Sequence, residues 1–141
     1  MPESSPALPS VEDLQQLIGP LFPGLMGVRL VEAEPKRVVA SLRVRPDLCT
    51  SGAILHGGAV MAFADTLGAI GAYLNLPPGK RTTTIESSTK FIGASKVATE
   101  VTGIATPFHI GRSASVWQTQ ITNEQGRLCA VVTQTQLVLE A

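Results

Sequence analysis

The stretch GGAVMAFADTLGAIGAYL, residues 57–74, decides the fold of this 141-residue chain. Drawn as a helix, it is apolar around its whole circumference, and Pro77, Pro78 and Gly79 terminate it. Such a helix lies inside a protein core or spans a membrane. Internal glycines, the central acid Asp65 and the absence of basic flanks make the segment a poor membrane span. We therefore expect a helix enclosed by protein, with no membrane partner.

The segments around this helix predict β-strands. GVRLVEAE (27–34) and RVVASLRV (37–44) read as a hairpin. Further runs rich in Thr, Val, Ile and Ser lie at 82–92, 97–106, 113–123 and 128–139. A curved antiparallel sheet wrapped around the apolar helix would cover most of it, which predicts an α+β fold. The remaining face of the helix must be covered by something else.

A short amphipathic helix is predicted at residues 11–19, ahead of the first strand. Ser10 is the expected N-cap and Asp13 completes a capping box. Pro20, Pro23 and Gly24 are expected to end the helix. Residues 45–56 read as a loop, and Pro107–Gly111 and Asn123–Gly126 as breaks between later strands.

Composition narrows the classes of function. Net charge is zero, from 11 basic and 11 acidic residues, and no basic run is dense enough for a nucleic-acid or anionic-membrane surface. Cys49 and Cys129 fit neither a disulfide framework nor a metal-ligand spacing, so we expect reduced packing residues and no metal. Residues 1–10 read as a loose tail without signal-peptide character, which predicts a cytoplasmic protein with one domain at 11–141.

Asp65 is the only formally charged residue between Asp47 and Lys80. An ionised carboxylate in an apolar interior costs several kcal/mol unless it is paired or hydrogen-bonded. A buried acid is therefore a candidate functional group. The alternative is structural, with Asp65 capping a loop or binding a buried hydroxyl.

The triplet His56-Gly57-Gly58 opens the apolar helix. Backbone N–H groups and the positive end of the helix dipole are available there. They can bind an anion or stabilise a developing oxyanion. Alternatively, the glycines only permit a tight turn and His56 only caps the helix.

The distance along the helix separates Asp65 from the glycines at the helix start. Gly57 and Asp65 are eight residues apart, or roughly 12 Å along a helix, too far to act on one carbonyl. The same helix from a second subunit, lying antiparallel, would bring Asp65 of one chain to Gly57 of the other. Small residues such as Ala62, Ala64 and Gly68 permit that approach. We therefore expect a homodimer as the functional unit, with two identical sites.

The run ILHGGAVMAFADTLGAIGAYL (54–74) resembles the signature of the hotdog thioesterases, in the branch of the PaaI proteins and the HGG-type 4-hydroxybenzoyl-CoA thioesterases. TTIESSTKFIGAS (83–95) and GRSASVWQTQITNEQGRLCAVVTQT (111–135) extend the likeness. The resemblance implies a hotdog fold and an acyl-CoA thioesterase that forms homotetramers as dimers of dimers. Coenzyme A is then part of the substrate, and no separate cofactor is expected.

The resemblance also implies residue roles. The Gly57 N–H would polarise the thioester carbonyl, and His56 would shape the pocket. Asp65 of the opposite subunit would be the general base or the nucleophile. Thr84 matches a water-orienting hydroxyl, with Thr83 one register away.

Other residues would bind the substrate. Thr50 stands where many relatives carry Asn, and Gly58 joins it in the predicted binding set. Lys90, Arg112 and Ser113, taken as strand residues, would hold the nucleotide end of CoA; the alternative is a solvated role for each. Apolar residues that could line an acyl pocket are Phe63, Leu67, Leu74, Phe91 and Ile92.

Two other functions remain open. A hotdog dehydratase or hydratase is one, but its HFPG motif has Leu21 in place of the histidine before Phe22-Pro23-Gly24. A non-catalytic acyl-CoA-binding dimer is the other. The sequence contains no G-x-S-x-G elbow and only two histidines, so a serine-triad mechanism is not expected.

Overall fold

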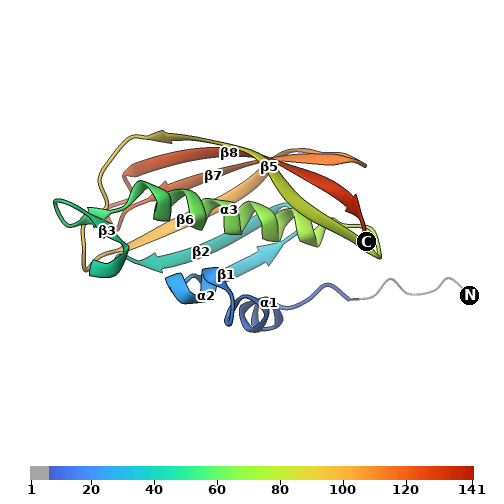
Figure 1. Cartoon of the computed structure of the whole chain (residues 1–141), viewed down its shortest axis with the longest axis horizontal. Coiled ribbons are helices and arrows are strands. Elements are labelled where there is room, and N and C mark those ends of the chain that lie inside the picture. Colours follow the sequence, from blue (N-terminus) through green and yellow to red (C-terminus); the bar gives the residue numbers. More distant parts are fainter. Residues whose placement is uncertain (1–6) are drawn as a thin grey trace, which may run out of the picture.

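The computed structural model describes residues 7–141, so part of the predicted tail over 1–10 lies outside the described residues. Helices and strands follow one another in a simple order (Figure 1). The elements are α1 Val11–Ile18, α2 Phe22–Met26, β1 Arg29–Glu34, β2 Arg37–Arg43, a 3-10 turn at Pro46–Leu48, β3 Cys49–Thr50, β4 Ile54–Leu55, α3 Gly57–Leu74, β5 Lys80–Phe91, β6 Glu100–Ile110, β7 Ala114–Thr122 and β8 Leu128–Glu140.

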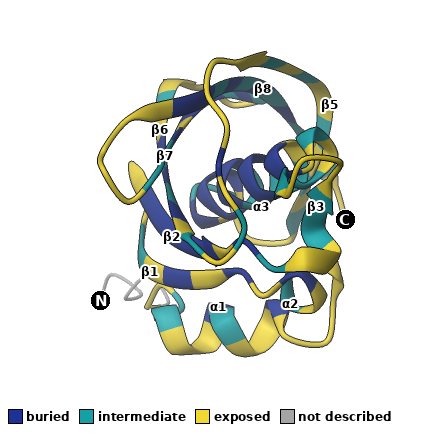
Figure 2. Ribbon diagram, turned by 90° about the vertical axis from the view of Figure 1, so that its left-hand side faces the viewer, coloured by how far each residue is buried: buried dark blue, intermediate teal, exposed yellow. Residues whose placement is uncertain are grey.

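Six strands form one antiparallel sheet in the order β1-β2-β6-β7-β8-β5. The sheet curves around α3, which runs along its concave face (Figures 1 and 2). β3 and β4 form a separate two-stranded ribbon just before α3. The predicted α+β architecture, a curved sheet around a long central helix, is confirmed.

The core lies between α3 and the sheet. Phe63 and Leu67 of α3 and Trp117 of β7 are fully buried. A Cβ at Gly71 would overlap the Trp117 ring, and one at Gly103 of β6 would come within about 3 Å of Phe63 and Leu67. These two glycines therefore allow the helix to approach the sheet closely.

One face of α3 is uncovered in the single chain. Met61 is 37% and Tyr73 46% exposed, and Asp65 between them is half-buried. The helix is long and apolar enough to cross a membrane by length and composition, but 56% of it is buried inside the fold. That burial fits a core helix. The uncovered face is the one that the sequence analysis expected to be covered by something other than the sheet.

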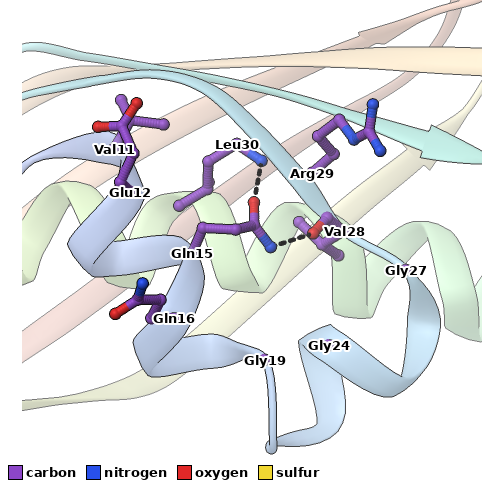
Figure 3. Close-up of a pocket in the computed structure, with 10 residues that line it drawn as sticks. All are labelled: Val11, Glu12, Gln15, Gln16, Gly19, Gly24, Gly27, Val28, Arg29 and Leu30. Carbon is purple, nitrogen blue, oxygen red and sulfur yellow. Dashed lines mark hydrogen bonds between the residues drawn. The ribbon is translucent and has the colours of Figure 1, made fainter.

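The two edges of the sheet differ. At the start of the β1 edge, the side chain of Gln15 on α1 binds two backbone groups (Figure 3). Its Nε2 donates to the Val28 carbonyl at 3.0 Å, and the Leu30 N–H donates to its Oε1 at 2.8 Å. At the other edge, the 12-residue strand β5 pairs with β8 alone among the described residues. The β5 edge is therefore open to a further strand.

Prolines and glycines account for most differences from the predicted elements. Pro23-Gly24 does not only end the first helix but lies within α2, because the fixed φ of proline suits a first helical turn. Pro107 does not end a strand at 106: β6 continues to Ile110, with its register shifted between Pro107 and His109. Such irregularities are where a sheet tolerates proline. The loop predicted at 45–56 contains the small ribbon.

The predicted cap of the first helix and the two cysteines agree with the structure. Ser10 caps α1, and its capping box with Asp13 is present. Cys49 and Cys129 are free thiols, half-buried and buried respectively, as predicted.

Candidate functional site

Asp65 lies midway along α3 on the uncovered face of the helix. The Thr84 hydroxyl donates to Asp65 Oδ1 at 2.6 Å. Gln134 Nε2 donates to the same oxygen at 3.1 Å and to the Asp65 carbonyl at 3.3 Å. Oδ2 has no protein partner within residues 7–141. The bond to a hydroxyl that the structural alternative foresaw is present, yet it occupies only one oxygen of the carboxylate.

A cavity of about 280 Å³ borders this carboxylate. Its lining also includes Met61, Ala62, Thr84 and Ser87. The inward position on β5 belongs to Thr84, whereas Thr83 is exposed. Of the two threonines that the sequence left open, the structure therefore places Thr84 against Asp65.

Two glutamines of β8, which sequence reasoning missed, complete the surroundings of Asp65. Gln134 is 0% and Gln136 1% exposed. Gln136 Nε2 donates to Thr84 Oγ1 at 2.5 Å, and its Oε1 accepts from the Thr82 hydroxyl at 3.1 Å. The only available signal was the period of two on β8, which places 132, 134 and 136 on one face.

The His56-Gly57-Gly58 turn begins α3. His56 is the N-cap, and its Nδ1 accepts the Gly58 N–H at 2.8 Å. The capping alternative for His56 is therefore present, and the Gly58 N–H is occupied. The first N–H of the helix, at Gly57, has no intrahelical acceptor. It remains a candidate donor for a bound group.

Gly57 lies beside the end of β5. A Cβ at this position would be 3.3 Å from the Phe91 ring. Gly57 lines a cavity of about 340 Å³ that also includes Thr50, Phe91 and Ile92. The structure thus brings the predicted residues Thr50 and Gly57 to one cavity, with Phe91 and Ile92 each 58% exposed beside them.

His56 and Gly58 line a different, largely apolar cavity of about 440 Å³, formed with α2. Arg45 holds its wall together by donating to the carbonyls of Met26 at 3.0 Å and Leu25 at 3.1 Å. The hydrogen bond from Arg45 also lowers the pKa of the Asp47 carboxyl below its usual value.

The predicted site residues therefore divide between cavities within one chain. Asp65 and Thr84 line one, Gly57 and Thr50 a second, and His56 a third. A single chain does not bring Asp65 and Gly57 to a common cavity.

The residues predicted to hold CoA are separated as well. Lys90 pairs with Val131 of β8, whereas the Ser113 carbonyl accepts from the Val138 N–H. At about 3.3 Å per residue, these points on β8 lie on the order of 20 Å apart. The sequence predicted Arg112 and Ser113 to be strand residues, which is wrong: both lie in the exposed connection between β6 and β7. One protomer does not gather the three into one cationic site.

Three of the proposed acyl-pocket residues belong to the core. Phe63 and Leu67 are 0% exposed and Leu74 is 6% exposed. They pack in the main hydrophobic cluster, so only Phe91 and Ile92 of that set are accessible.

Comparison with known proteins gives consistent matches. A family model described as "Thioesterase superfamily" matches residues 52–130. The 1,4-dihydroxy-2-naphthoyl-CoA hydrolase of Listeria monocytogenes is 31% identical over 106 residues, which cover 75% of this chain and 85% of that protein.

Solved structures match over most of their length. The thioesterase HI1161 of Haemophilus influenzae superimposes with a TM-score of 0.89 at 27% identity, covering 95% of this chain and 93% of that one. The PaaI protein of the E. coli phenylacetic acid degradation operon gives a TM-score of 0.78 at 18% identity, covering 84% of each chain, a likeness of fold.

Proposed function

Because this chain belongs to the thioesterase superfamily, with its hotdog fold and thioester-hydrolase activity, we propose that its substrate is an acyl-CoA and that Asp65 is its catalytic carboxylate. The acyl-CoA class is supported by the Listeria relative, which is named as a CoA-thioester hydrolase. The observation that carries the role of Asp65 is its geometry. Two donors hold Oδ1, Oδ2 accepts no hydrogen bond from residues 7–141, and the carboxylate residue borders a cavity of about 280 Å³.

The chemistry needs a carboxylate and an oxyanion donor. A thioester carbonyl is electrophilic, and a backbone N–H at a helix N-terminus can stabilise the oxyanion that forms on attack. In the proposed site, the Gly57 N–H binds the carbonyl oxygen. Asp65 of the opposite subunit either removes a proton from the attacking water or attacks the carbonyl itself to give a mixed anhydride. With Asp65 as base, the C–S bond breaks after water has added, and the CoA thiolate receives the proton that Asp65 removed from that water. With Asp65 as nucleophile, its attack expels the CoA thiolate, and a water then hydrolyses the anhydride to the free acid, which restores Asp65 and supplies the proton for the thiolate.

The two halves of the site meet in a dimer. Gln15 occupies two backbone groups at the start of the β1 edge, whereas no described residue pairs with the β5 edge, so a second copy has the β5 edge and the uncovered face of α3 available to it. On β5, Thr84 marks the position of Asp65 and Phe91 marks that of Gly57. Antiparallel β5–β5 pairing that places Thr84 opposite the partner's Phe91 therefore brings Asp65 towards the partner's Gly57.

This requirement selects one register for the pair. Inward-facing residues must lie opposite inward-facing ones if the two sheets are to continue into one another. Ile85 is an extra residue on β5, where the register shifts between Thr84 and Glu86. Allowing for that bulge, both conditions are met when the two-fold axis passes through Ser88. The dimer then contains two identical sites.

Thiol release from a panel of acyl-CoAs tests the proposal. We expect the wild-type protein to release free thiol, Asp65→Ala to lose this turnover and Asp65→Glu to retain part of it. The matched control is Thr66→Val, the next residue on α3, whose hydroxyl bonds only to the Ala62 carbonyl. Full turnover in Asp65→Ala would disprove the role of Asp65. CoA binding without thiol release would instead favour the acyl-CoA-binding dimer, and hydration of an enoyl-CoA would favour the hydratase.

Two further expectations stay predictions. A cytoplasmic location and a dimer-of-dimers assembly follow from the resemblance and the composition alone. Sedimentation of the purified protein would test the assembly.

A further inference from the structure

The hydrogen bonds behind Asp65 have a defined direction. The Thr82 hydroxyl donates to Gln136 Oε1, which turns Gln136 Nε2 towards Thr84. Nε2 then donates to Thr84 Oγ1 at 2.5 Å, and Thr84 donates its only proton to Asp65 at 2.6 Å. If the Gln136 amide were reversed, Thr84 would face two acceptors with one proton. The arrangement therefore directs the Thr84 proton to the carboxylate.

Gln134 reaches Asp65 independently of this chain of bonds. Its Nε2 is shared between Asp65 Oδ1 and the Asp65 backbone carbonyl, which ties the carboxylate to the helix turn that carries it. Its Oε1 is buried and has no partner in the described residues. An unpaired buried amide oxygen is unfavourable by itself. The only hydrogen bonds that the Gln134 side chain makes within the described residues are therefore the two to Asp65. These two bonds are the reason we find for a buried glutamine at this position.

We propose that Gln134 and Gln136 are positioning residues for catalysis, an inference that rests on the proposed role of Asp65. Gln134 holds Oδ1 directly, and Gln136 acts through Thr84. Together they leave Oδ2 as the oxygen that meets the water or the thioester carbon. Thr84 then holds the carboxylate in place and does not orient the water by donating to it, because its single hydroxyl proton is used in the bond to Asp65 Oδ1. This role differs from the water-orienting role implied by the family resemblance.

A double-mutant cycle tests whether Gln134 acts on Asp65 directly and Gln136 acts through Thr84. Gln134→Met and Gln136→Met keep side-chain length and remove the hydrogen bonds. We expect each to lower kcat roughly ten- to a hundredfold, the range for loss of a bond that supports a charged group, with KM within about twofold. Gln136→Met should have no further effect in a Thr84→Val background, whereas Gln134→Met should lower kcat further there. Thr84→Ser, which keeps the hydroxyl, should retain activity.

The matched control is Thr119→Val on β7, away from the β5 edge. The Thr119 hydroxyl is buried and has no partner among residues 7–141, so wild-type kcat is expected. If Asp65→Ala is active, the proposed function fails. If Asp65→Ala is inactive while Gln134→Met and Gln136→Met have wild-type kcat, only the positioning role fails.

A measurement on the unmodified protein covers variants that do not fold. By NMR, the side-chain amide protons of Gln134 and Gln136 should exchange with solvent at least tenfold more slowly than those of exposed Gln125. Exchange of all three at the same rate would overturn the inference.

Discussion

Gly68 on α3 lies so close to Gln134 of β8 that a methyl group at position 68 would overlap the Gln134 side-chain amide. Glycine inside a helix costs about 0.5–1 kcal/mol relative to alanine, because the unfolded chain loses more freedom. The helix therefore carries an unfavourable residue at the one turn where Gln134 approaches Asp65. This contact connects the packing of the core with the geometry of the carboxylate.

Gly68→Ala should consequently damage activity more than stability. The added methyl pushes the Gln134 amide away from Asp65 Oδ1, and we expect kcat to fall at least tenfold. Alanine's better helix propensity offsets part of the overpacking cost of about 1–3 kcal/mol. Thiol release and thermal unfolding measured on the same preparation would show the difference.

Gly71→Ala provides the control for that substitution. It is the same chemical change on the same helix, but its methyl would meet the Trp117 ring and not Gln134. We expect lower stability with kcat per folded molecule unchanged. Equal losses of kcat in the two variants would contradict the specific role of the Gly68–Gln134 contact.

The proposed two-fold axis at Ser88 can be tested by cross-linking. Ser88 is exposed on β5, and in the proposed register it lies opposite its own copy. Directly opposite residues of antiparallel strands have Cβ atoms about 4.5–5.5 Å apart, close to disulfide geometry. Ser88→Cys should therefore give a covalent dimer on oxidation, seen as a doubled mass on non-reducing gels.

Thr83→Cys is the matched control for the cross-link. It is also exposed on β5 but lies several residues from the proposed axis, so little covalent dimer is expected. Wild-type protein oxidised in parallel shows how much covalent dimer forms through Cys49 and Cys129 alone. More dimer from Thr83→Cys than from Ser88→Cys would rule out this register.

Much of the fold was predictable because its signals are local. The apolar helix at 57–74 and its proline-rich end fixed the bounds of α3, and the capping box fixed the start of α1. The hairpin of β1 and β2 was likewise visible as two β runs around Pro35. Errors occurred where tertiary pairing outweighs a local breaker, as at Pro107, which β6 accommodates at a register shift.

The site was predictable only in part, for a physical reason. Asp65 is conspicuous as a lone charge in an apolar run. Gln134 and Gln136 are not, because TQTQ in a strand rich in Thr and Val resembles the solvent-facing residues of the neighbouring strand, where Gln120 is exposed. Only the sheet register places them under Asp65. Sequence spacing also could not predict which cavity each residue lines.

Gln15 provides a test of what its two bonds contribute at the start of the β1 edge. Its side-chain amide satisfies both Val28 O and Leu30 N, as Figure 3 shows. Gln15→Leu would leave those two backbone groups without protein partners, and we expect a loss of about 1–3 kcal/mol of unfolding free energy. Urea denaturation would measure it.

The neighbouring Gln16→Leu is the control for Gln15. Gln16 is exposed, and substitutions at such positions usually change stability by less than about 0.5 kcal/mol. Equal midpoints for the two variants would mean that the Gln15 amide does not contribute to the edge.

The capping box of α1 makes a prediction about pH. The Ser10 backbone N–H donates to Asp13 Oδ2 at 3.0 Å, and this bond, followed by the one with the Ser10 side chain, lowers the pKa of Asp13 below its ordinary value of 3.8. Because the folded-state pKa lies below the unfolded one, the contribution to stability is fully present above about pH 3.8 and is lost as pH falls through the folded value.

Asp13→Asn should therefore lower Tm at pH 7, because it removes the charge from the N-terminal turn of α1 while keeping the size of the side chain. The difference in Tm between the wild type and the variant should stay constant from pH 7 to pH 5 and then shrink towards pH 3, as Asp13 becomes protonated and neutral like its replacement. Comparing the two proteins at each pH removes the titration of all other groups. A Tm difference that remained unchanged down to pH 3 would show that the charge of Asp13 does not support the helix.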